Sequence, residues 1–187
     1  MRLTGTVRAD RPLLVVALDL EAAQLGGDLP VLITGVGKVR AAVSVAAALA
    51  AVRPAYVVNL GTAGALWHGL DGIHEIGTVV QHDFDDDGVA AVVGQHYGGP
   101  LVLGEGPTLA TGDRFVAGGA VREALAAHAD LVDMEGYAVA AACRATGVPV
   151  RLVKLVSDDA GEDAGRTWVE SVADHAHTLA AWATDHL

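Results

Sequence analysis

The sequence predicts a single α/β domain, residues 1–187, in which helices cover both faces of a central mixed, mostly parallel sheet. Two observations carry this prediction. Strand-length apolar runs alternate with helical segments along the chain. With 187 residues and 52% hydrophobic residues, the chain has the size and the apolar content of one compact core. No repeat or linker divides it, so we expect a three-layer α/β/α architecture.

The first half of the chain contains three apolar runs of strand length. Their continuous character is typical of strands that are buried on both faces. Pro54 disfavours helical geometry at the residue before it, so the alanine-rich helix should end there. In order, the expected elements are a strand at 13–18, a helix at 19–25, a strand at 31–33, a helix at 38–52 and a strand at 55–60.

The second half is less regular. An acidic run at 83–87 is interpreted as a turn between two strands, and Gly147 is placed to end a helix. Near the C-terminus, Thr167 and Glu170 have the spacing of a capping box. The expected elements are strands at 76–81 and 89–93, a helix at 121–128, a strand at 131–132, a helix at 136–146, a strand at 148–156 and a final helix from Thr167.

Charge and composition exclude several classes of function. Lys and Arg number 12 and Asp and Glu 23, so the net charge of −11 argues against nucleic-acid or anionic-membrane partners. The longest apolar run, 41–52, is too short to span a bilayer, and the N-terminus lacks a signal-peptide core. Cys143 is the single cysteine, and the histidines form no metal-ligand pattern. We therefore expect a cytoplasmic protein that binds a small molecule, with no metal and no cofactor.

Three carboxylates each follow a predicted strand. Glu21, Glu135 and Asp158 come just after, or at the end of, the apolar runs at 13–18, 131–132 and 148–156. In α/β sheets, ligands are bound at these strand ends. Acids without a comparable basic cluster suit a neutral substrate that reacts through a cationic transition state, such as a sugar ring.

In these segments the chain resembles the 5′-methylthioadenosine/S-adenosylhomocysteine nucleosidases, within the larger nucleoside phosphorylase and nucleosidase family. Six matching segments occur in the family's order, and they are spread along most of the chain, from Ala17 to Asp158. They are Ala17-Leu18-Asp19-Leu20-Glu21, Thr34 to Ala42, Asn59-Leu60-Gly61-Thr62-Ala63-Gly64, Thr111-Gly112-Asp113-Arg114-Phe115-Val116, Val132-Asp133-Met134-Glu135 to Ala140, and Lys154-Leu155-Val156-Ser157-Asp158.

The resemblance implies hydrolysis of the N-glycosidic bond of a 5′-modified purine ribonucleoside to free base and sugar. Asp158 would donate a proton toward N7 of the purine, and Glu21 would activate the attacking water. Glu135 would accept hydrogen bonds from the ribose hydroxyls. Met134 would pack under the sugar, and Phe115 would stack on the base.

The resemblance also implies further substrate-binding residues. The backbone of Val116 would read the edge of the base, and Thr62 and Lys154 would lie near the attacking water. Lys154 departs from the arginine that is commoner there, and lysine lacks arginine's planar fork. Trp168 would line the 5′ end of the substrate or, equally, anchor the last helix in the core. The remaining implied residues are Ala63, Gly64, Asp133 and Ser157.

Four alternatives remain open: a phosphate-dependent purine nucleoside phosphorylase, a futalosine hydrolase, a nucleoside-binding protein without turnover, and a flavodoxin-like regulatory or binding domain. Phosphorylases of the family carry an arginine where this chain has Asn59, and a phosphate beside Glu21 would be repelled. Water is therefore the favoured nucleophile. The chain is shorter than the family pattern between Glu21 and Thr34 and from Gln81 to Gly99, which leaves the 5′ substituent undetermined.

The resemblance and the surface chemistry together predict a homodimer. The expected helices at 38–52 and 136–146 are rich in small residues that permit close packing. Apolar residues spread over more of the first helix than one sheet contact needs: Ala41, Ala42, Val45, Ala46, Leu49 and Val52. We therefore expect a two-fold symmetric dimer with the helix after Gly37 in its interface.

Overall fold

The computed structural model describes residues 1–25 and 27–187, apart from the side chains of residues 166–172. Within this part, ten strands form one sheet in the order β1-β3-β2-β4-β9-β8-β6-β7, and β10 pairs with β4 and β5. Five of the nine strand pairings are parallel and four are antiparallel. The sheet is therefore mixed and mostly parallel, as expected.

The bounds of the elements are as follows. The first half holds β1 (Arg2–Thr4), β2 (Leu13–Val16), α1 (Asp19–Ala22), β3 (Val31–Ile33), α2 (Lys38–Ala51), β4 (Val57–Ala65), β5 (Ile73–Glu75) and β6 (Thr78–Gln81). The second half holds α3 (Asp86–Val93), β7 (Leu101–Val102), β8 (Thr108–Thr111), α4 (Gly119–Ala126), β9 (Leu131–Asp133), α5 (Gly136–Thr146), β10 (Val150–Asp158) and α6 (Ala164–His186).

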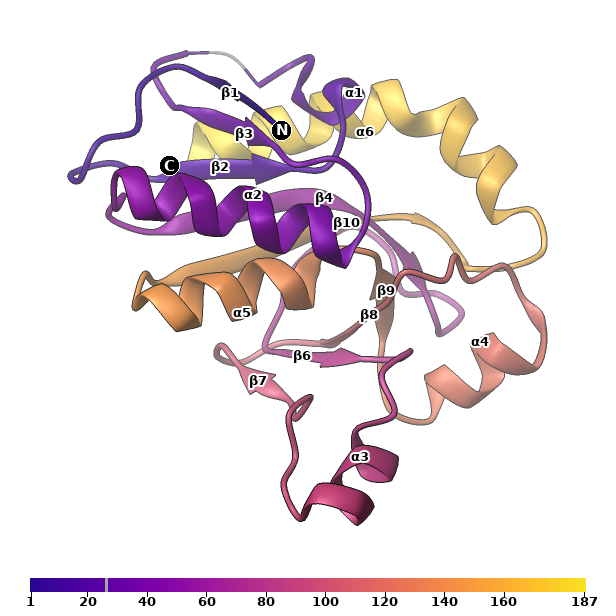
Figure 1. Cartoon of the computed structure of the whole chain (residues 1–187). Helices are drawn as coiled ribbons and strands as arrows, with labels where there is room; N and C mark the ends of the chain where they lie inside the picture. The colour runs from indigo at the N-terminus through magenta and orange to yellow at the C-terminus, as the bar shows by residue number, and fades with distance from the viewer. Residues whose placement is uncertain (26) are drawn as a thin grey trace.

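Helices cover both faces of the sheet (Figure 1), with α2 and α5 on one face and α1 and α6 on the other. Successive side chains of a strand point to opposite faces of the sheet, so one apolar run contributes to the core on both faces. Leu13 and Val15 of β2 pack in the cluster under α2 and α5, whereas Leu14 and Val16 pack in the cluster under α6. The three-layer α/β/α prediction is confirmed. None of the helices in the described part is both long and apolar enough to cross a membrane.

The strand expected at 89–93 is wrong, because Asp86–Val93 forms helix α3. The end of the acidic run starts this helix, with Asp85 as the N-cap and Asp86 and Asp87 in the first turn, so the run is not a hairpin turn between strands. The side chain of Asp85 accepts a hydrogen bond from the N–H of Gly88 and caps the helix, and Gly94 ends it in a left-handed conformation. Negative side chains in the first turn also suit the helix dipole.

Several other bounds differ from the sequence prediction. The last helix begins at Ala164, three residues before Thr167, and the proposed capping box lies among side chains outside the described part. β4 continues five residues past Leu60 to Ala65, and β10 continues to Asp158. These longer strands matter for function, because their additional residues reach the candidate site.

Candidate active site

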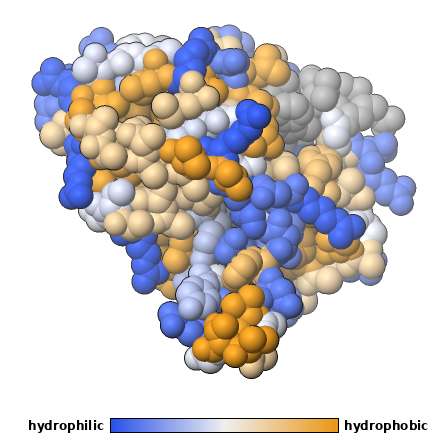
Figure 2. Space-filling model, in the orientation of Figure 1, coloured by the Kyte–Doolittle hydropathy of each residue, from blue (hydrophilic) through white to orange (hydrophobic). Residues whose placement is uncertain are grey.

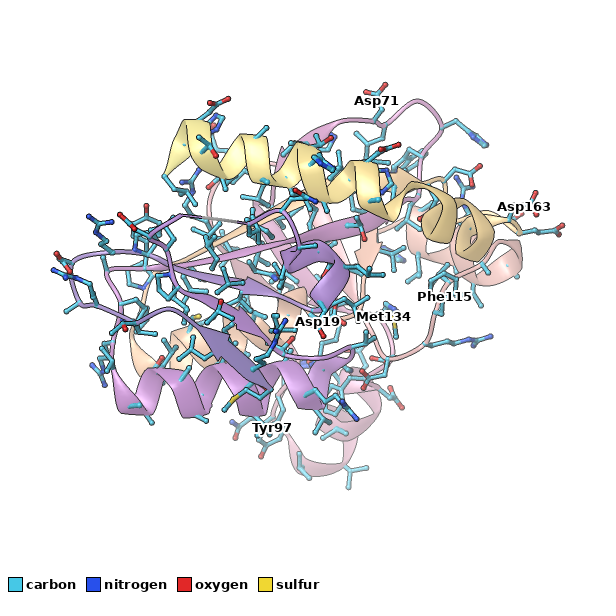
Figure 3. The ribbon with its side chains drawn as sticks, turned by 90° about the horizontal axis from the view of Figure 1, so that it is seen from above. Asp19, Asp71, Tyr97, Phe115, Met134 and Asp163 are labelled. Carbon is cyan, nitrogen blue, oxygen red and sulfur yellow. The ribbon has the colours of Figure 1, made fainter. Side chains whose placement is uncertain are left out.

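Segments from four strands surround one cavity. Its volume is about 280 Å³, near the lower end of the range for small-molecule sites, about 300–1,000 Å³. It lies beside the second half of β4 and where β2, β9 and β10 end. Phe115 and Met134 are on this side of the molecule (Figure 3). The predicted residues that line it are Glu21, Thr62, Ala63, Gly64, Phe115, Val116, Asp133, Met134, Glu135, Ser157 and Asp158.

Glu21 reaches the cavity from the short helix α1 and is 5% exposed. Its Oε2 accepts hydrogen bonds from the N–H groups of Ala17 and Leu18, both at 3.0 Å, and its Oε1 accepts one from Thr62 at 3.4 Å. Burial raises the pKa of Glu21, while the charge of Lys154 and these N–H groups oppose the rise. The carboxylate is therefore fixed in place and can take up a proton.

Asp133 and Lys154 form a buried ion pair. Asp133 Oδ2 lies 2.9 Å from Lys154 Nζ, and the lysine is 1% exposed. Asp133 also accepts hydrogen bonds from Thr111 Oγ1 at 2.6 Å and from the N–H of Gly136 at 2.8 Å. Burial opposes the charge on Lys154, but Asp133 and the neighbouring carboxylates outweigh burial and raise the lysine's pKa. The pair is thus fully hydrogen-bonded on the carboxylate side.

Gly61 allows Glu21 and Lys154 to share one side of β4. A Cβ atom at Gly61 would lie 3.2 Å from Glu21 Oε1 and 3.4 Å from Lys154 Nζ. A side chain there would press against both groups. Glycine at position 61 therefore leaves room for the two charged groups to approach the strand closely.

Glu135 is the N-cap residue of α5 and is 9% exposed. Its Oε1 accepts a hydrogen bond from the N–H of Gly37 at 2.8 Å, so the turn before α2 orients it. Burial and, next, the charge of Asp133 raise the pKa of Glu135 to about 7, against the opposing effect of Lys154. Since a carboxylate accepts several hydrogen bonds, acceptor capacity remains for hydroxyl groups of a ligand.

Asp158 ends β10 and is half-buried. Its Oδ2 accepts a hydrogen bond from Ser157 Oγ at 2.7 Å, and its Oδ1 accepts one from the N–H of Ala160 at 2.8 Å. Ala160 has a φ of 50°, the one positive φ of a non-glycine residue in the described part. A Cβ atom at Gly64 would lie 3.0 Å from both Asp158 Oδ1 and the Ala160 side chain, so a larger residue here would press against the acid and the turn behind it.

The segment after β8 combines an exposed ring with a fixed backbone. Phe115 is 56% exposed, whereas Val116 is 6% exposed. Asp113 Oδ1 accepts a hydrogen bond from the N–H of Lys38 at 2.7 Å, and the N–H of Asp113 donates to Asp83 Oδ2 at 2.7 Å. The start of α2 therefore holds this segment, and the aromatic ring stays open to a planar ligand.

One predicted site residue, Lys154, does not line the cavity, and the side chain of a second, Trp168, is outside the described part of the chain. Lys154 lies beneath it, in contact with Asp133 and not with the open space. The side chain of Trp168 lies outside the described part, so its expected place at the 5′ end stays a prediction. Asn59 is built into the sheet, where its amide donates to the backbone oxygen of Val15 at 3.0 Å.

Other lining residues were missed as site residues, although each lies inside a matching segment. The signal that could have found four of them is their nearness in sequence to Glu21, Phe115 or Asp133, whereas Val36 has no such neighbour. The missed residues are Ala17, Leu18, Val36, Arg114 and Val132. Among the side chains that the structure describes, no group of three or more His, Cys, Asp or Glu residues is placed to hold a metal ion.

Comparison with known proteins identifies the family of this chain. The family model of the phosphorylase superfamily matches residues 83–186. A 5′-methylthioadenosine/S-adenosylhomocysteine nucleosidase of Marinomonas sp. (strain MWYL1) is 31% identical over 175 residues, 78% of this chain and 74% of the relative. The nucleosidase of the same description from Bacillus subtilis (strain 168) is 32% identical over 184 residues, 82% of this chain and 79% of the relative.

A solved structure of a futalosine hydrolase mutant from Helicobacter pylori strain 26695 has the same fold. Its TM-score is 0.83 at 20% identity, covering 95% of this chain and 100% of that one. The chain therefore belongs to the phosphorylase superfamily, and its similarity along most of its length places it with the 5′-methylthioadenosine/S-adenosylhomocysteine nucleosidases.

Proposed function

We propose that this protein is a nucleosidase, an N-glycosyl hydrolase that converts a 5′-modified purine ribonucleoside of the methylthioadenosine or adenosylhomocysteine type into free base and sugar. The observation that carries the proposal is the convergence of Glu21, Glu135 and Asp158 on one cavity, in a chain related to such nucleosidases. We also propose that residues 1–187 act as one cytoplasmic catalytic domain.

In the proposed reaction, the bond between N9 of the purine and C1′ of the ribose breaks, and its electron pair leaves with the base. Asp158 donates a proton to N7, so that the base departs neutral. The position of Asp158 supports this role, because Ser157 and Ala160 hold both of its oxygens at the edge of the cavity. The stacking role goes to Phe115, whose ring is open to the cavity.

The nucleophile in the proposal is a water molecule that bonds to C1′ through its oxygen and gives one proton to Glu21. A base is more effective as its pKa approaches the working pH, and burial moves the pKa of Glu21 in that direction. Once the products leave, solvent returns the proton that Asp158 gave away and removes the one that Glu21 took.

Glu135 is proposed to bind the ribose hydroxyls and to stabilise the positive charge that develops on the sugar. The free acceptor capacity of its carboxylate and its place in the cavity lining support this role. Lys154 is proposed to support the site and not to contact the substrate, because its charge is already neutralised by Asp133. It keeps the acids close together without presenting a cation to the sugar.

Phosphorolysis is disfavoured by the charges around the cavity. Of the described residues that line it, Arg114 is the one cation, and four are acidic: Glu21, Asp133, Glu135 and Asp158. A phosphate dianion beside these acids would be repelled. The position where phosphorylases carry an arginine is Asn59, which is buried in the sheet.

We further propose a two-fold homodimer with α2 in its interface. The expected apolar set needs correction, since Ala41, Val45 and Leu49 are buried in the core and α5 is buried along most of its length. The exposed face of α2 supports the proposal instead, because Val39 is 72% and Val43 64% exposed. Val36, 41% exposed, both continues this face and lines the cavity, so a partner chain would adjoin the site.

The experiment for this proposal is a panel of purine nucleosides that differ in the 5′ group: hydroxyl, methylthio, homocysteinyl and a carboxylated aromatic. Release of free base is followed by chromatography, with Asp158→Asn as the inactive reference. The proposal expects release from at least one 5′-thio substrate. Binding of these nucleosides without release of base would instead identify a nucleoside-binding protein.

A further inference from the structure

Helix α4 lies outside the cavity lining but joins the two parts of the site that handle the leaving base. It begins at Gly119, directly after the segment that carries Phe115 and Val116. Val121 and Leu125 of α4 pack against the same apolar cluster that contains Val116 and Ala160. The base-binding segment and the turn behind the proposed acid therefore share one support.

The turn that follows Asp158 is held at three backbone positions. The N–H of Ala160 donates back to Asp158 Oδ1 at 2.8 Å, and the N–H of Gly118 donates to the backbone oxygen of Ala160 at 2.6 Å. The third bond comes from a side chain: Arg122 Nε of α4 donates to the backbone oxygen of Asp159 at 2.7 Å. Because Ala160 has a left-handed φ of 50°, the turn persists only where surrounding contacts hold it.

In this position, Arg122 leaves one of its own hydrogen-bond donors without a partner in the described part of the chain. Its side chain is half-buried, and Nη2 is buried without a hydrogen-bond partner in the described part of the chain. A buried donor without a partner is unfavourable, and rotation of the side chain into solvent would hydrate it. Departures of this kind from local rules are expected at functional sites.

We infer that Arg122 is a positioning residue for the proposed acid. It fixes the turn at Asp159 to the helix whose first residues continue the base-binding segment. The distance between the carboxyl group of Asp158 and N7 of a stacked purine is thereby set by α4. This inference rests on the proposed nucleosidase function.

A looser turn would affect proton transfer more than binding. The stacked base is held by Phe115 and Val116, and the ribose by Glu135, none of which Arg122 contacts through a hydrogen bond. Proton transfer, by contrast, depends on a donor–acceptor distance within about 2.6–3.2 Å. Loss of the Arg122 bond should therefore lower kcat and leave KM nearly unchanged.

The test compares Arg122→Leu with Arg53→Leu, which removes an exposed arginine before β4, away from the cavity. Both are measured on the best purine nucleoside and on 4-nitrophenyl riboside, whose leaving group departs without protonation. For Arg122→Leu we expect kcat on the nucleoside to fall roughly 10-fold, the effect of losing one positioning hydrogen bond. KM should change less than about 2-fold, and activity on the nitrophenyl riboside less than about 2-fold.

Arg122→Lys keeps a cationic donor and should recover most of the lost rate, and Arg122→Met replaces the leucine variant if that one does not fold. Equal losses on both substrates, or kinetics of Arg122→Leu that match those of Arg53→Leu, would overturn the inference while leaving the nucleosidase function intact. No release of base by the unmodified protein would overturn both.

Discussion

The acid cluster in the sheet and the arm formed by residues 82–99 around α3 are built in opposite ways. In the cluster, charged groups are buried and held by hydrogen bonds: Lys154 and Asp133 pair at 2.9 Å, and Glu21 accepts from three backbone N–H groups. In the arm, α3 has no buried residue, and its apolar side chains face outward. Val92 is 85% and Tyr97 62% exposed.

This difference indicates that the two regions have different roles. All groups of the cluster come from one chain, and the strands of the sheet bring them together. The arm buries little apolar surface against the rest of the chain, and hydrophobic residues gather over it at the tip of the molecule (Figure 2). Exposed apolar surface of this kind marks contact regions. We therefore assign the bond cleavage to the cluster, and the dimer proposed above would place the exposed apolar surfaces of α2 and α3 against a partner chain.

The largest expected effect concerns the acid. Asp158→Asn removes the proton needed by the leaving purine and should lower kcat by about 10²–10⁴-fold. The matched control is Asp185→Asn, an exposed carboxylate near the C-terminal end of α6 and outside the cavity lining, which should stay within a few-fold of the unmodified enzyme. Both are measured by release of free base. Comparable activity in the two variants would place the acid elsewhere.

The buried ion pair gives the next effect, on stability. Lys154→Met leaves Asp133 buried without its cation and should lower the free energy of unfolding by about 3–5 kcal/mol. Urea unfolding measures the loss. Adding Asp133→Asn to this variant should recover part of the stability, because the unpaired charge is then gone. A single variant within about 1 kcal/mol of the unmodified protein would contradict the buried pairing.

A smaller effect is expected at the surfaces assigned to a partner chain. Val43→Glu on α2 and Val92→Glu on α3 should shift the protein toward the monomer, because each places a charge on an exposed apolar surface. Leu3→Glu on the exposed strand β1 is the control and should leave the dimer intact. Sedimentation velocity at micromolar concentration measures the fractions of monomer and dimer for each variant. A 19.0 kDa species for the unmodified protein would refute the dimer altogether.

The smallest effect is a pH dependence of stability. The pKa of Glu135 is raised from 4.5 to about 7 in the folded state, so the folded protein binds its proton more tightly than the unfolded chain. Stability from this group is present below about pH 4.5 and is lost as the pH rises through about 7. Glu135→Gln should flatten that part of the profile in urea unfolding at a series of pH values. An unchanged slope would show that another group titrates there.

The comparison also shows how far the sequence alone reaches. Glu21, Glu135 and Asp158 were predictable because acids after buried strands meet at one side of a sheet. The position of Lys154 beneath the cavity was not predictable, because it depends on an ion pair with Asp133, which lies 21 positions earlier in the chain. The strand expected at 89–93 failed for a related reason. Its valines suggest burial, but tertiary contacts decide burial, and no residue of α3 is buried.

The measurement that tests the central claim most directly is the identity of the sugar product. The best nucleoside of the panel is incubated with the protein in buffer with and without phosphate, and the products are identified by phosphorus and proton NMR. We predict equal release of base in both buffers, with free sugar as the product. Release of base only with phosphate, with sugar 1-phosphate as the product, would contradict the hydrolytic mechanism.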